Sequence, residues 1–236
     1  MKASIAAIIC SAGSSKRMRG RKKEYMRLGS LTVLGSAVSA FASCPRIGPI
    51  IVTEPPDGKS AAAAYLPPDL LTRVFFVTGG PSRRASVYNA LSFLESHKTS
   101  YVLIHDGARP WIKKDLIEKT IDAVIRFGAV IPALPLIETP KELGAGLCLE
   151  LSTSENAEFI TRHLRRENLC TAQTPQGFKF PEILRAHEKA REREEKEGFL
   201  YTDDAEIWGE FAGKVAVIPG DIGNRKITYP EDLAIC

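Results

Sequence analysis

The sequence lacks the cysteine and histidine patterns of metal-binding or disulfide-stabilised domains. Its five cysteines include no C-x-x-C pair. An odd number without framework spacing predicts reduced thiols and a cytoplasmic location. The four histidines are scattered and show no metal-ligand spacing. These absences argue against a cysteine–histidine metal centre and against a secreted disulfide framework.

The sequence also lacks a long apolar run. The first residues pass directly into a strand-like segment, with no basic region ahead of it. We therefore expect no signal, transit or transmembrane segment, and no membrane partner. The 236 residues are 44% hydrophobic and 25% charged, which suffices for one globular core. We expect a single domain over residues 1–236.

Positive charge is concentrated in one short window. The net charge is +4, from 32 Lys and Arg against 28 Asp and Glu. The window from Lys16 to Arg27 holds seven of these cations and one acid, Glu24, so the remainder of the chain has 25 against 27. Nucleic-acid-binding proteins usually spread their cations over a face, so one basic loop favours a compact anion. A nucleic-acid patch remains the alternative at this point.

Short apolar runs alternate with helix-length segments along most of the chain. The runs are continuously apolar, which is typical of strands buried on both faces of a parallel sheet. They cover residues 4–10, 48–53, 73–79, 100–107 and 129–136, with helical patterns at 31–43, 83–97 and 113–128. This alternation predicts an α/β fold, a mostly parallel sheet covered by helices. Ligands of such folds bind at the carboxyl ends of the strands, so the loops after Cys10, Gly79, Ile104 and Leu136 are the candidates.

The alternation of strand-like and helical segments ends near Leu136. Residues 147–151 and 157–160 are two short strand-like pieces around a polar turn, which predicts a projecting β-hairpin arm at about 136–164. Beyond it, residues 181–198 form a helical pattern with mixed charges, typical of a solvated face. A last strand is expected at 214–220.

The loop after Cys10 has the composition of a phosphate-binding turn. It reads Ser-Ala-Gly-Ser-Ser and is followed at once by the cations of the basic window. Backbone N–H groups of such a turn at a helix N-terminus can cradle phosphates, and the cations add charge-assisted bonds. The loop matches neither the Walker pattern nor G-x-G-x-x-G. A solvated basic loop is the alternative.

Two further loops at the ends of predicted strands contain residues suited to ligand binding. Gly79 and Gly80 follow a predicted strand, and Ser82 or Ser86 would cap the next helix. Arg83 and Arg84 lie at the N-terminus of that helix, the end that favours anions. An ordinary capped helix is the alternative explanation of this segment. In the second loop, Asp106 could bind a metal or accept a bond from a substrate hydroxyl. An ion pair between Asp106 and Arg109 that shapes a turn is the alternative. We interpret His105 as structural.

The last third of the chain adds hydroxyls and one lysine. Thr174 and Thr202 lie in predicted loops, and Lys226 follows a Gly-Asn turn, where a surface lysine is the simpler interpretation. Asp203 and Asp204 have the pattern of a helix N-cap followed by an acid in the first turn.

Taken together and in order, these segments resemble one family, the 2-C-methyl-D-erythritol 4-phosphate cytidylyltransferases of the non-mevalonate isoprenoid route. "SAGSSKRM" through "KKEY" resembles the family's Gly-rich, R-M, P-K-Q-Y loop, and "GGPSRRASVYNAL" resembles G-G-x-x-R-x-x-S-V. "HDGARP" resembles H-D-A-A-R-P. "ETPK", "RRENLCTAQTPQGF", "TDDA" and "NRKIT" with "PEDL" resemble later family motifs. Each motif is weak alone, but seven in order are specific.

The resemblance implies a Rossmann-like nucleotidyltransferase fold with a dimerising arm, and CTP and Mg²⁺ as requirements. It implies a homodimer with exchanged arms, with CTP and a polyol phosphate as partners, and no nucleic acid. The cations expected around the reacting phosphates are Arg17, Lys23 and Lys226. The residues expected to contact the nucleotide are Ala12, Gly13, Gly80, Arg83 and Ser86. The residues expected to contact the methylerythritol phosphate are Asp106, Arg109, Thr139, Arg166, Thr174 and Thr202.

The nucleotide loop departs from the family pattern more than the rest. Lys22 stands where the family has proline, Glu24 where it has glutamine, and Ser15 replaces the second glycine of the loop. Elsewhere Arg225 stands for an apolar residue, Cys170 for an aromatic residue and Glu138 for an aspartate.

The cytidylyl-transfer reaction that the resemblance implies needs the positive charge of these residues. Attack of a substrate phosphate oxygen on an α-phosphorus raises charge on the phosphoryl oxygens and the leaving pyrophosphate, so the protein must supply positioning and positive charge. A ribitol-5-phosphate cytidylyltransferase is one alternative, and the "ETPK" and "RRENL" segments favour methylerythritol phosphate over it. A non-catalytic nucleotide-binding regulatory relative is the other, and joint retention of Arg17, Lys23 and Lys226 argues against it.

Overall fold

The computed structural model describes residues 3–13, 15, 18, 21–56, 62–144 and 159–233. Its main sheet contains β1 (Ile5–Cys10), β4 (Ile47–Glu54), β5 (Val74–Thr78), β6 (Tyr101–Asp106), β7 (Ala129–Pro135), β10 (Cys170–Ala172), β11 (Gln176–Lys179) and β12 (Ala216–Pro219). The helices are α1 (Val33–Ala42), α2 (Arg83–Leu94), α3 (Lys114–Phe127), α4 (Phe180–Glu197) and α5 (Asp204–Phe211). Short 3₁₀ turns are η2 (Lys23–Tyr25), η3 (Ala62–Tyr65), η4 (Pro68–Arg73), η6 (Arg166–Asn168) and η7 (Pro230–Leu233).

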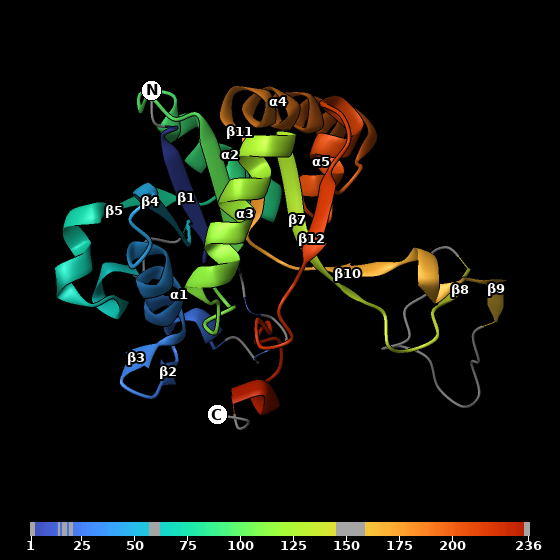
Figure 1. The fold of residues 1–236 in the computed structure, drawn as a ribbon, viewed down its shortest axis with the longest axis horizontal. Helices are drawn as coiled ribbons and strands as arrows, with labels where there is room; N and C mark the ends of the chain where they lie inside the picture. Colours follow the sequence, from blue (N-terminus) through green and yellow to red (C-terminus); the bar gives the residue numbers. More distant parts are fainter. Residues whose placement is uncertain are drawn as a thin grey trace.

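The sheet has the predicted, mostly parallel arrangement (Figure 1). Its order is β10-β7-β11-β6-β1-β4-β5, and β12 pairs with β7. β1 runs parallel to β4 and β6, β4 to β5, and β12 to β7. The order β5-β4-β1-β6 is that of one half of a Rossmann-type sheet, in which the strand order reverses beside the first strand. The predicted α/β class is confirmed.

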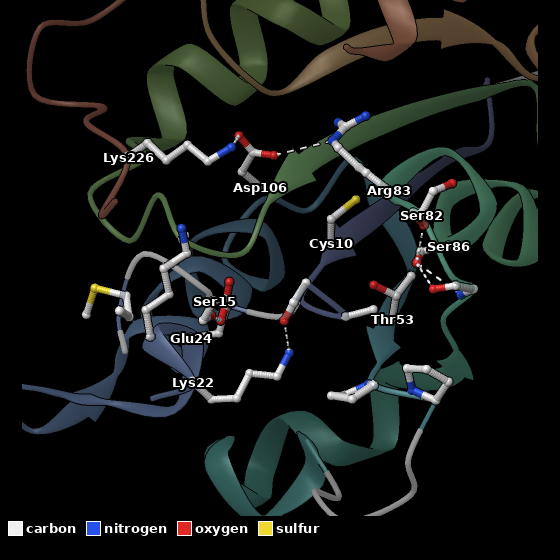
Figure 2. Close-up of a pocket in the computed structure, with 18 of the residues that line it drawn as sticks. Cys10, Ser15, Lys22, Glu24, Thr53, Ser82, Arg83, Ser86, Asp106 and Lys226 are labelled. Atoms are coloured by element: carbon white, nitrogen blue, oxygen red, sulfur yellow. Dashed lines mark hydrogen bonds and ion pairs between the residues drawn. The ribbon is translucent and has the colours of Figure 1, made fainter. Parts of the chain in front are cut away.

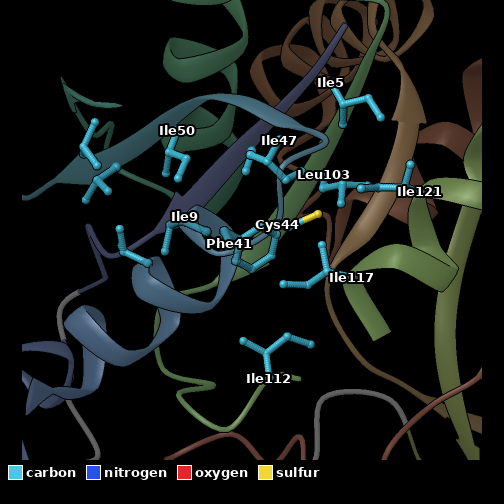
Figure 3. Packing of buried hydrophobic residues seen from close by; sticks show 14 of the residues in the cluster. Ile5, Ile9, Phe41, Cys44, Ile47, Ile50, Leu103, Ile112, Ile117 and Ile121 are labelled. Carbon is cyan, nitrogen blue, oxygen red and sulfur yellow. The ribbon is translucent and has the colours of Figure 1, made fainter. Parts of the chain in front are cut away.

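Helices cover both faces of the sheet, which explains the continuously apolar strands. Along β1, Ile5 and Ile9 pack with α1 and α3 on one face, whereas Ile8 packs with α2, α4 and α5 on the other. Figure 3 shows the first face, where Ile9 lies beside Phe41 and Ile117 faces them. Burial of each such side chain contributes about 1.5–3 kcal/mol, so this two-sided core determines the stability of the sheet.

The helix boundaries follow from capping residues. Thr32 caps α1, Ser82 caps α2 and Asp203 caps α5, each accepting a bond from a backbone N–H three residues on. Ser82, not Ser86, is therefore the cap of α2. Gly128 is the C-cap of α3 and Gly198 that of α4, with φ of 83° and 67°. These positive values favour glycine, which bears no Cβ.

Two short strands that were not predicted flank the loop of Thr174. Residues 170–172 form β10 and residues 176–179 form β11, both antiparallel to β7, and β11 lies between β6 and β7. A Cβ at Gly177 would lie 3.0 Å from Leu103 and 3.1 Å from Val124, so glycine permits this close packing. A four-residue strand that contains glycine has little sequence signal, so β11 was not among the predicted strands. Thr174 lies between the two strands, in a loop as predicted.

A two-stranded ribbon projects from the body of the molecule (Figure 1). β8 (Lys141–Leu143) pairs antiparallel with β9 (Ile160–His163), so the described part of the predicted arm is a ribbon. The expected strand at 147–151 lies outside the described residues, and the observed partner of the second strand begins six residues earlier. A second small ribbon, β2 (Arg27–Leu28) with β3 (Leu31–Thr32), precedes α1. Of the helices in the described ranges, none combines the length and apolar character of a membrane span.

Candidate active site

A cavity of about 730 Å³ opens at the carboxyl ends of four parallel strands. Its wall includes Cys10 at the end of β1, Thr53 near the end of β4, Gly80 after β5 and Asp106 at the end of β6. This is the place that the topology predicts for a ligand. Three of the four candidate loops meet here, whereas the loop after Leu136 leads into the arm.

The cavity gathers most of the residues predicted for the nucleotide and the reacting phosphates. Those that line it are Ala12, Gly13, Lys23, Gly80, Arg83, Ser86 and Lys226. Asp106, predicted to contact the methylerythritol phosphate, lines it too. They come from the first, middle and last parts of the chain, so only the folded sheet brings them together. Arg17, the third predicted cation, lies outside the described residues.

The Gly-Gly turn after β5 packs tightly against the loop after β1. A Cβ at Gly79 would lie 2.4 Å from the Cβ of Ala12, and one at Gly80 would lie 2.5 Å from the Cβ of Ala85. Ser86 is buried beneath the turn; its Oγ accepts a bond from Gly80 N (3.0 Å) and donates to the carbonyl oxygen of Ser82 (2.9 Å). Ser86 therefore holds the turn that forms the cavity wall.

Asp106 is the centre of a cluster of cations (Figure 2). Lys226 Nζ lies 2.9 Å and Arg109 Nε 3.4 Å from Asp106 Oδ2, and Arg83 Nε lies 3.8 Å from Oδ1. Burial alone would raise the pKa of Asp106, but Lys226, Arg83 and Arg109 together lower it far below its ordinary value. The carboxylate is ionised and orients the cations toward the cavity. The ion pair between Asp106 and Arg109, given above as the structural alternative, is present. A contact of Asp106 with the substrate stays a prediction.

The cluster extends into the core through a second carboxylate. Arg83 NH2 lies 2.7 Å from Oδ2 of Asp204, and His187 Nε2 lies 3.2 Å from Oδ1 of Asp204. Burial would raise the pKa of Asp204, but Arg83 and His187 lower it below its ordinary value. Burial likewise would lower the pKa of Arg83, and Asp204 raises it. Asp203 is the predicted cap, but the pairing of Asp204 with Arg83 was missed, because no local pattern links residues this far apart.

Lys23 and Lys226 reach the cavity from opposite ends of the chain. Lys23, in η2, is buried and donates from Nζ to the carbonyl oxygen of Ile227 (2.7 Å), the residue after Lys226. Ile227 N in turn donates to the carbonyl oxygen of Ala108 (2.8 Å). The segment after β12 is thereby fixed to the loop after β6. Lys226 is exposed, as its turn alone indicates, and its ammonium pairs with Asp106 on the cavity wall.

Thr174 and Arg109 lie behind Asp106 rather than on the cavity wall. Thr174 Oγ1 accepts a bond from Asp106 N (3.1 Å) and lies 2.9 Å from His105 Nδ1. Burial lowers the pKa of His105 to about 4, so the ring is neutral at neutral pH. A neutral ring can accept from Thr174 and donate from Nε2 to the carbonyl oxygen of Arg109 (3.2 Å). His105 is structural, as predicted.

Three residues predicted to contact the substrate lie away from the cavity of their own chain. Thr202 is exposed and donates from Oγ1 and N to Glu206 at the start of α5. Arg166 is in η6 and donates to the carbonyl oxygen of Ile137 (2.9 Å), and Thr139 is exposed on the arm. Their contacts with a substrate stay predictions.

The loop after β1 is held by two residues that depart from the family pattern. Lys22 Nζ donates to the carbonyl oxygen of Ser11 (2.9 Å) and to that of Gly13. Glu24 is buried and accepts a bond from Ser15 Oγ (3.2 Å). Both side chains line the cavity, although neither was among the predicted contacts. Burial raises the pKa of Cys10, a third lining residue, to about 12, so its thiol is uncharged at neutral pH.

The sheet and this cation-lined cavity define a nucleotidyltransferase. The family model "2-C-methyl-D-erythritol 4-phosphate cytidylyltransferase" matches residues 5–236. The chain belongs to that family.

Similar proteins agree with the assignment. The 2-C-methyl-D-erythritol 4-phosphate cytidylyltransferase of Geobacillus thermodenitrificans is 34% identical over 229 residues, covering 96% of this chain and 92% of the relative. The bifunctional enzyme IspD/IspF of Bradyrhizobium sp. (strain ORS 278) is 39% identical over 233 residues; 96% of this chain matches 54% of that protein, so the chain spans about half the bifunctional relative. Two crystal structures share the fold. That of 4-diphosphocytidyl-2C-methyl-D-erythritol synthase from Anaerococcus prevotii has a TM-score of 0.79 and 28% sequence identity, and the match covers 99% of this chain and 94% of that one. That of 2-C-methyl-D-erythritol 4-phosphate cytidylyltransferase from Thermus thermophilus has a TM-score of 0.74 and 28% identity, and the match covers 100% of this chain and 97% of that one.

Proposed function

We propose that this chain transfers a cytidylyl group from CTP to 2-C-methyl-D-erythritol 4-phosphate and releases pyrophosphate, as a step of non-mevalonate isoprenoid biosynthesis. The observation that supports it most is the cluster around Asp106, where Lys226 and Arg83 reach one carboxylate on the wall of a cavity of nucleotide size. Family membership adds the two substrates. The proposal is confined to cytidylyl transfer, because the bifunctional relatives are about twice as long.

The reaction needs charge stabilisation rather than a protein nucleophile. An oxygen of the substrate phosphate forms a bond to the α-phosphorus of CTP, and the bond from that phosphorus to the bridging oxygen of the β-phosphate breaks. Lys23, Lys226 and Arg83 supply positive charge to the phosphoryl oxygens and the departing pyrophosphate. Asp106 and Asp204 hold two of these cations in place before substrate binds. Arg17, by the family motif, would add a further cation.

Mg²⁺ fits this site in the manner usual for nucleotide enzymes. Within the described residues no group of three His, Cys, Asp or Glu could hold a metal ion by itself, so phosphate oxygens would supply most of its ligands. Asp106, an ionised carboxylate on the cavity wall, is the residue suited to hold the ion. Bound Mg²⁺ would neutralise phosphate charge as pyrophosphate leaves.

We further propose a homodimer in which the arm of one chain completes the cavity of the other. Ile137 and Phe159 are 80% and 81% exposed on the arm, and a two-stranded ribbon is marginal alone in water. A two-fold dimer would bury both arms reciprocally. It would also bring Arg166 and Thr139 to a cavity that they do not reach in their own chain. The free thiols of Cys10, Cys44 and Cys170 support a cytoplasmic location.

A turnover assay tests the function. Pyrophosphate release should require CTP, methylerythritol phosphate and Mg²⁺ together, and ATP, GTP and UTP should be poor donors. Ribitol 5-phosphate is the control acceptor; faster turnover with it would reassign the acceptor and keep the chemistry. Absence of CTP turnover with both acceptors would leave only nucleotide binding, as in a regulatory relative, and would contradict the enzyme.

A further inference from the structure

Lys22 is the first residue of the turn that carries Lys23, and its side chain returns to the loop after β1. Its ammonium donates to the carbonyl oxygens of Ser11 (2.9 Å) and Gly13, on the two sides of Ala12. Figure 2 shows the side chain of Lys22 reaching the loop from below the cavity, with Lys226 beside Asp106 on the other side of the cavity. The ammonium therefore lies within the predicted phosphate loop itself.

The backbone at this position does not require a lysine. The φ of Lys22 is −66°, the value that a proline ring imposes, and ψ is 99°. The family motif has proline here, which fits that backbone. The lysine of this chain keeps the same turn and adds a charge, so its side chain has a role that the turn alone does not explain.

The charge matters because of what it covers. The carbonyl oxygens of Ser11 and Gly13 carry partial negative charge and flank Ala12; Ala12 and Gly13 line a cavity suited to a triphosphate. Uncovered, such oxygens repel phosphate; hydrogen-bonded to an ammonium, they become part of a positive surface. The same bonds restrict the loop, and Glu24 restricts it further through Ser15.

We propose that Lys22 is a positioning residue for the nucleoside triphosphate: its ammonium covers the carbonyl oxygens of the loop after β1 and holds that loop in its phosphate-binding shape. It acts on binding of the nucleotide and not on the chemical step, which depends on Lys23 and Lys226. The proposal deepens the proposed function and rests on it.

Three variants isolate the ammonium. Lys22→Pro restores the residue of the family motif on a backbone already at its φ, Lys22→Gln keeps a side chain without charge, and Lys22→Arg keeps the charge. We expect Lys22→Pro and Lys22→Gln to raise KM for CTP roughly ten- to a hundredfold, the usual range for a lost bond to a charged group, with kcat changed less than about threefold. Lys22→Arg should stay within about threefold of wild type in both constants. Lys119→Ala, an exposed lysine of α3, is the control for lost charge elsewhere.

Calorimetry with CTP and with cytidine, in the absence of acceptor, separates this proposal from the function. Lys22→Pro should weaken binding of CTP at least tenfold and binding of cytidine less than twofold, with an unchanged melting temperature. Equal CTP affinity in wild type and Lys22→Pro would overturn the proposal, as would an equal loss for cytidine or a fall in kcat at constant KM. If wild type binds CTP but turns over neither acceptor, the proposed function fails and the binding result still decides the role of Lys22.

Discussion

The cavity has two walls that are held in different ways. The first, which we call the acid wall, consists of the lining residues Arg83, Asp106 and Lys226 with the buried Asp204 behind them. Ion pairs between residues far apart in sequence join it. The second, the loop wall, consists of Ser11, Gly13, Ser15, Lys22 and Glu24. Its contacts span at most eleven residues and end mainly on backbone oxygens. One wall is fixed by the core, whereas the other is fixed by its own side chains.

This difference separates two tasks of one site. Asp204 is fully buried against α4, so Arg83 and Asp106 have their positions before any substrate arrives. Preorganised charge of this kind lowers the barrier of the chemical step. The loop wall is held by contacts that are local in sequence, and it contains the predicted phosphate loop. Changes to the acid wall should therefore affect stability and kcat, and changes to the loop wall should affect nucleotide binding.

The largest effect is expected from the buried end of the acid wall. Asp204→Ala leaves Arg83 and His187 without their shared carboxylate, and breaking a buried pair costs about 3–5 kcal/mol. Urea unfolding measures it, and Asp203→Asn, which keeps a capping oxygen one residue earlier, is the matched control with an expected loss under ~1 kcal/mol. Equal midpoints for Asp204→Ala and wild type would mean that the acid wall does not depend on its buried carboxylate.

Removing either cavity lysine should come next. Lys23→Ala and Lys226→Ala should each lower kcat ~10²–10³-fold, or roughly 3–4 kcal/mol, with a smaller rise in KM for CTP, because both act where charge develops. Steady-state kinetics measures this, with Lys119→Ala as control. A larger effect on KM than on kcat would place these lysines with the loop wall and would remove the distinction between the walls.

Mixed dimers test whether a third element, the arm, belongs to the partner's cavity. If arms are exchanged, a dimer of Lys226→Ala and Arg166→Ala chains has one site with both changes and one with neither. Random mixing makes half the dimers mixed, so about a quarter of all sites should regain activity. Unfolding and refolding the mixture, then measuring turnover, gives the fraction. Near-zero recovery with mixed dimers demonstrably present would contradict the exchanged arm.

The two walls also differ in how far sequence can predict them. The five long strands and the three helices between them follow from apolar patterning, and the residues of the loop wall are close enough in sequence to form one motif. The pairing of Arg83 with Asp204 spans more than a hundred residues, so no local pattern indicates it.

The contacts of single residues were harder to predict than the fold. Lys226 has the local sequence of a surface lysine, and only the parallel sheet places it beside Asp106. β10 and β11 are too short for a periodic signal, and β11 contains a glycine. The arm was predicted from a break in rhythm, yet its described pairing begins at Lys141 rather than in the expected apolar run, because a solvent-exposed ribbon needs no continuous apolar segment.

Acidification should lower the stability of the protein through His105, whose ring lies behind Asp106 of the acid wall. Burial lowers the pKa of His105 to about 4, whereas the unfolded chain has about 6.5. Between these values the unfolded chain binds a proton that the folded chain does not. The contribution of His105 to stability is therefore full above pH ~6.5 and declines toward pH ~4, by roughly 2 kcal/mol at pH 5. Urea unfolding at pH 7.5 and 5 should show a smaller loss in His105→Gln than in wild type, and His163→Gln, on the exposed arm, should retain the full loss.

The smallest effect is expected at Ser15 in the loop wall. Its φ is 48°, a left-handed value that disfavours a serine, so Ser15→Gly relieves about 1 kcal/mol of backbone strain. The same change removes the bond from Ser15 Oγ to Glu24, worth about 0.5–1.5 kcal/mol. The two terms nearly cancel, so the melting temperature should move by less than about 2 °C and KM for CTP by less than about threefold. A shift beyond about 5 °C in either direction would show that the loop wall is coupled to the core as tightly as the acid wall is.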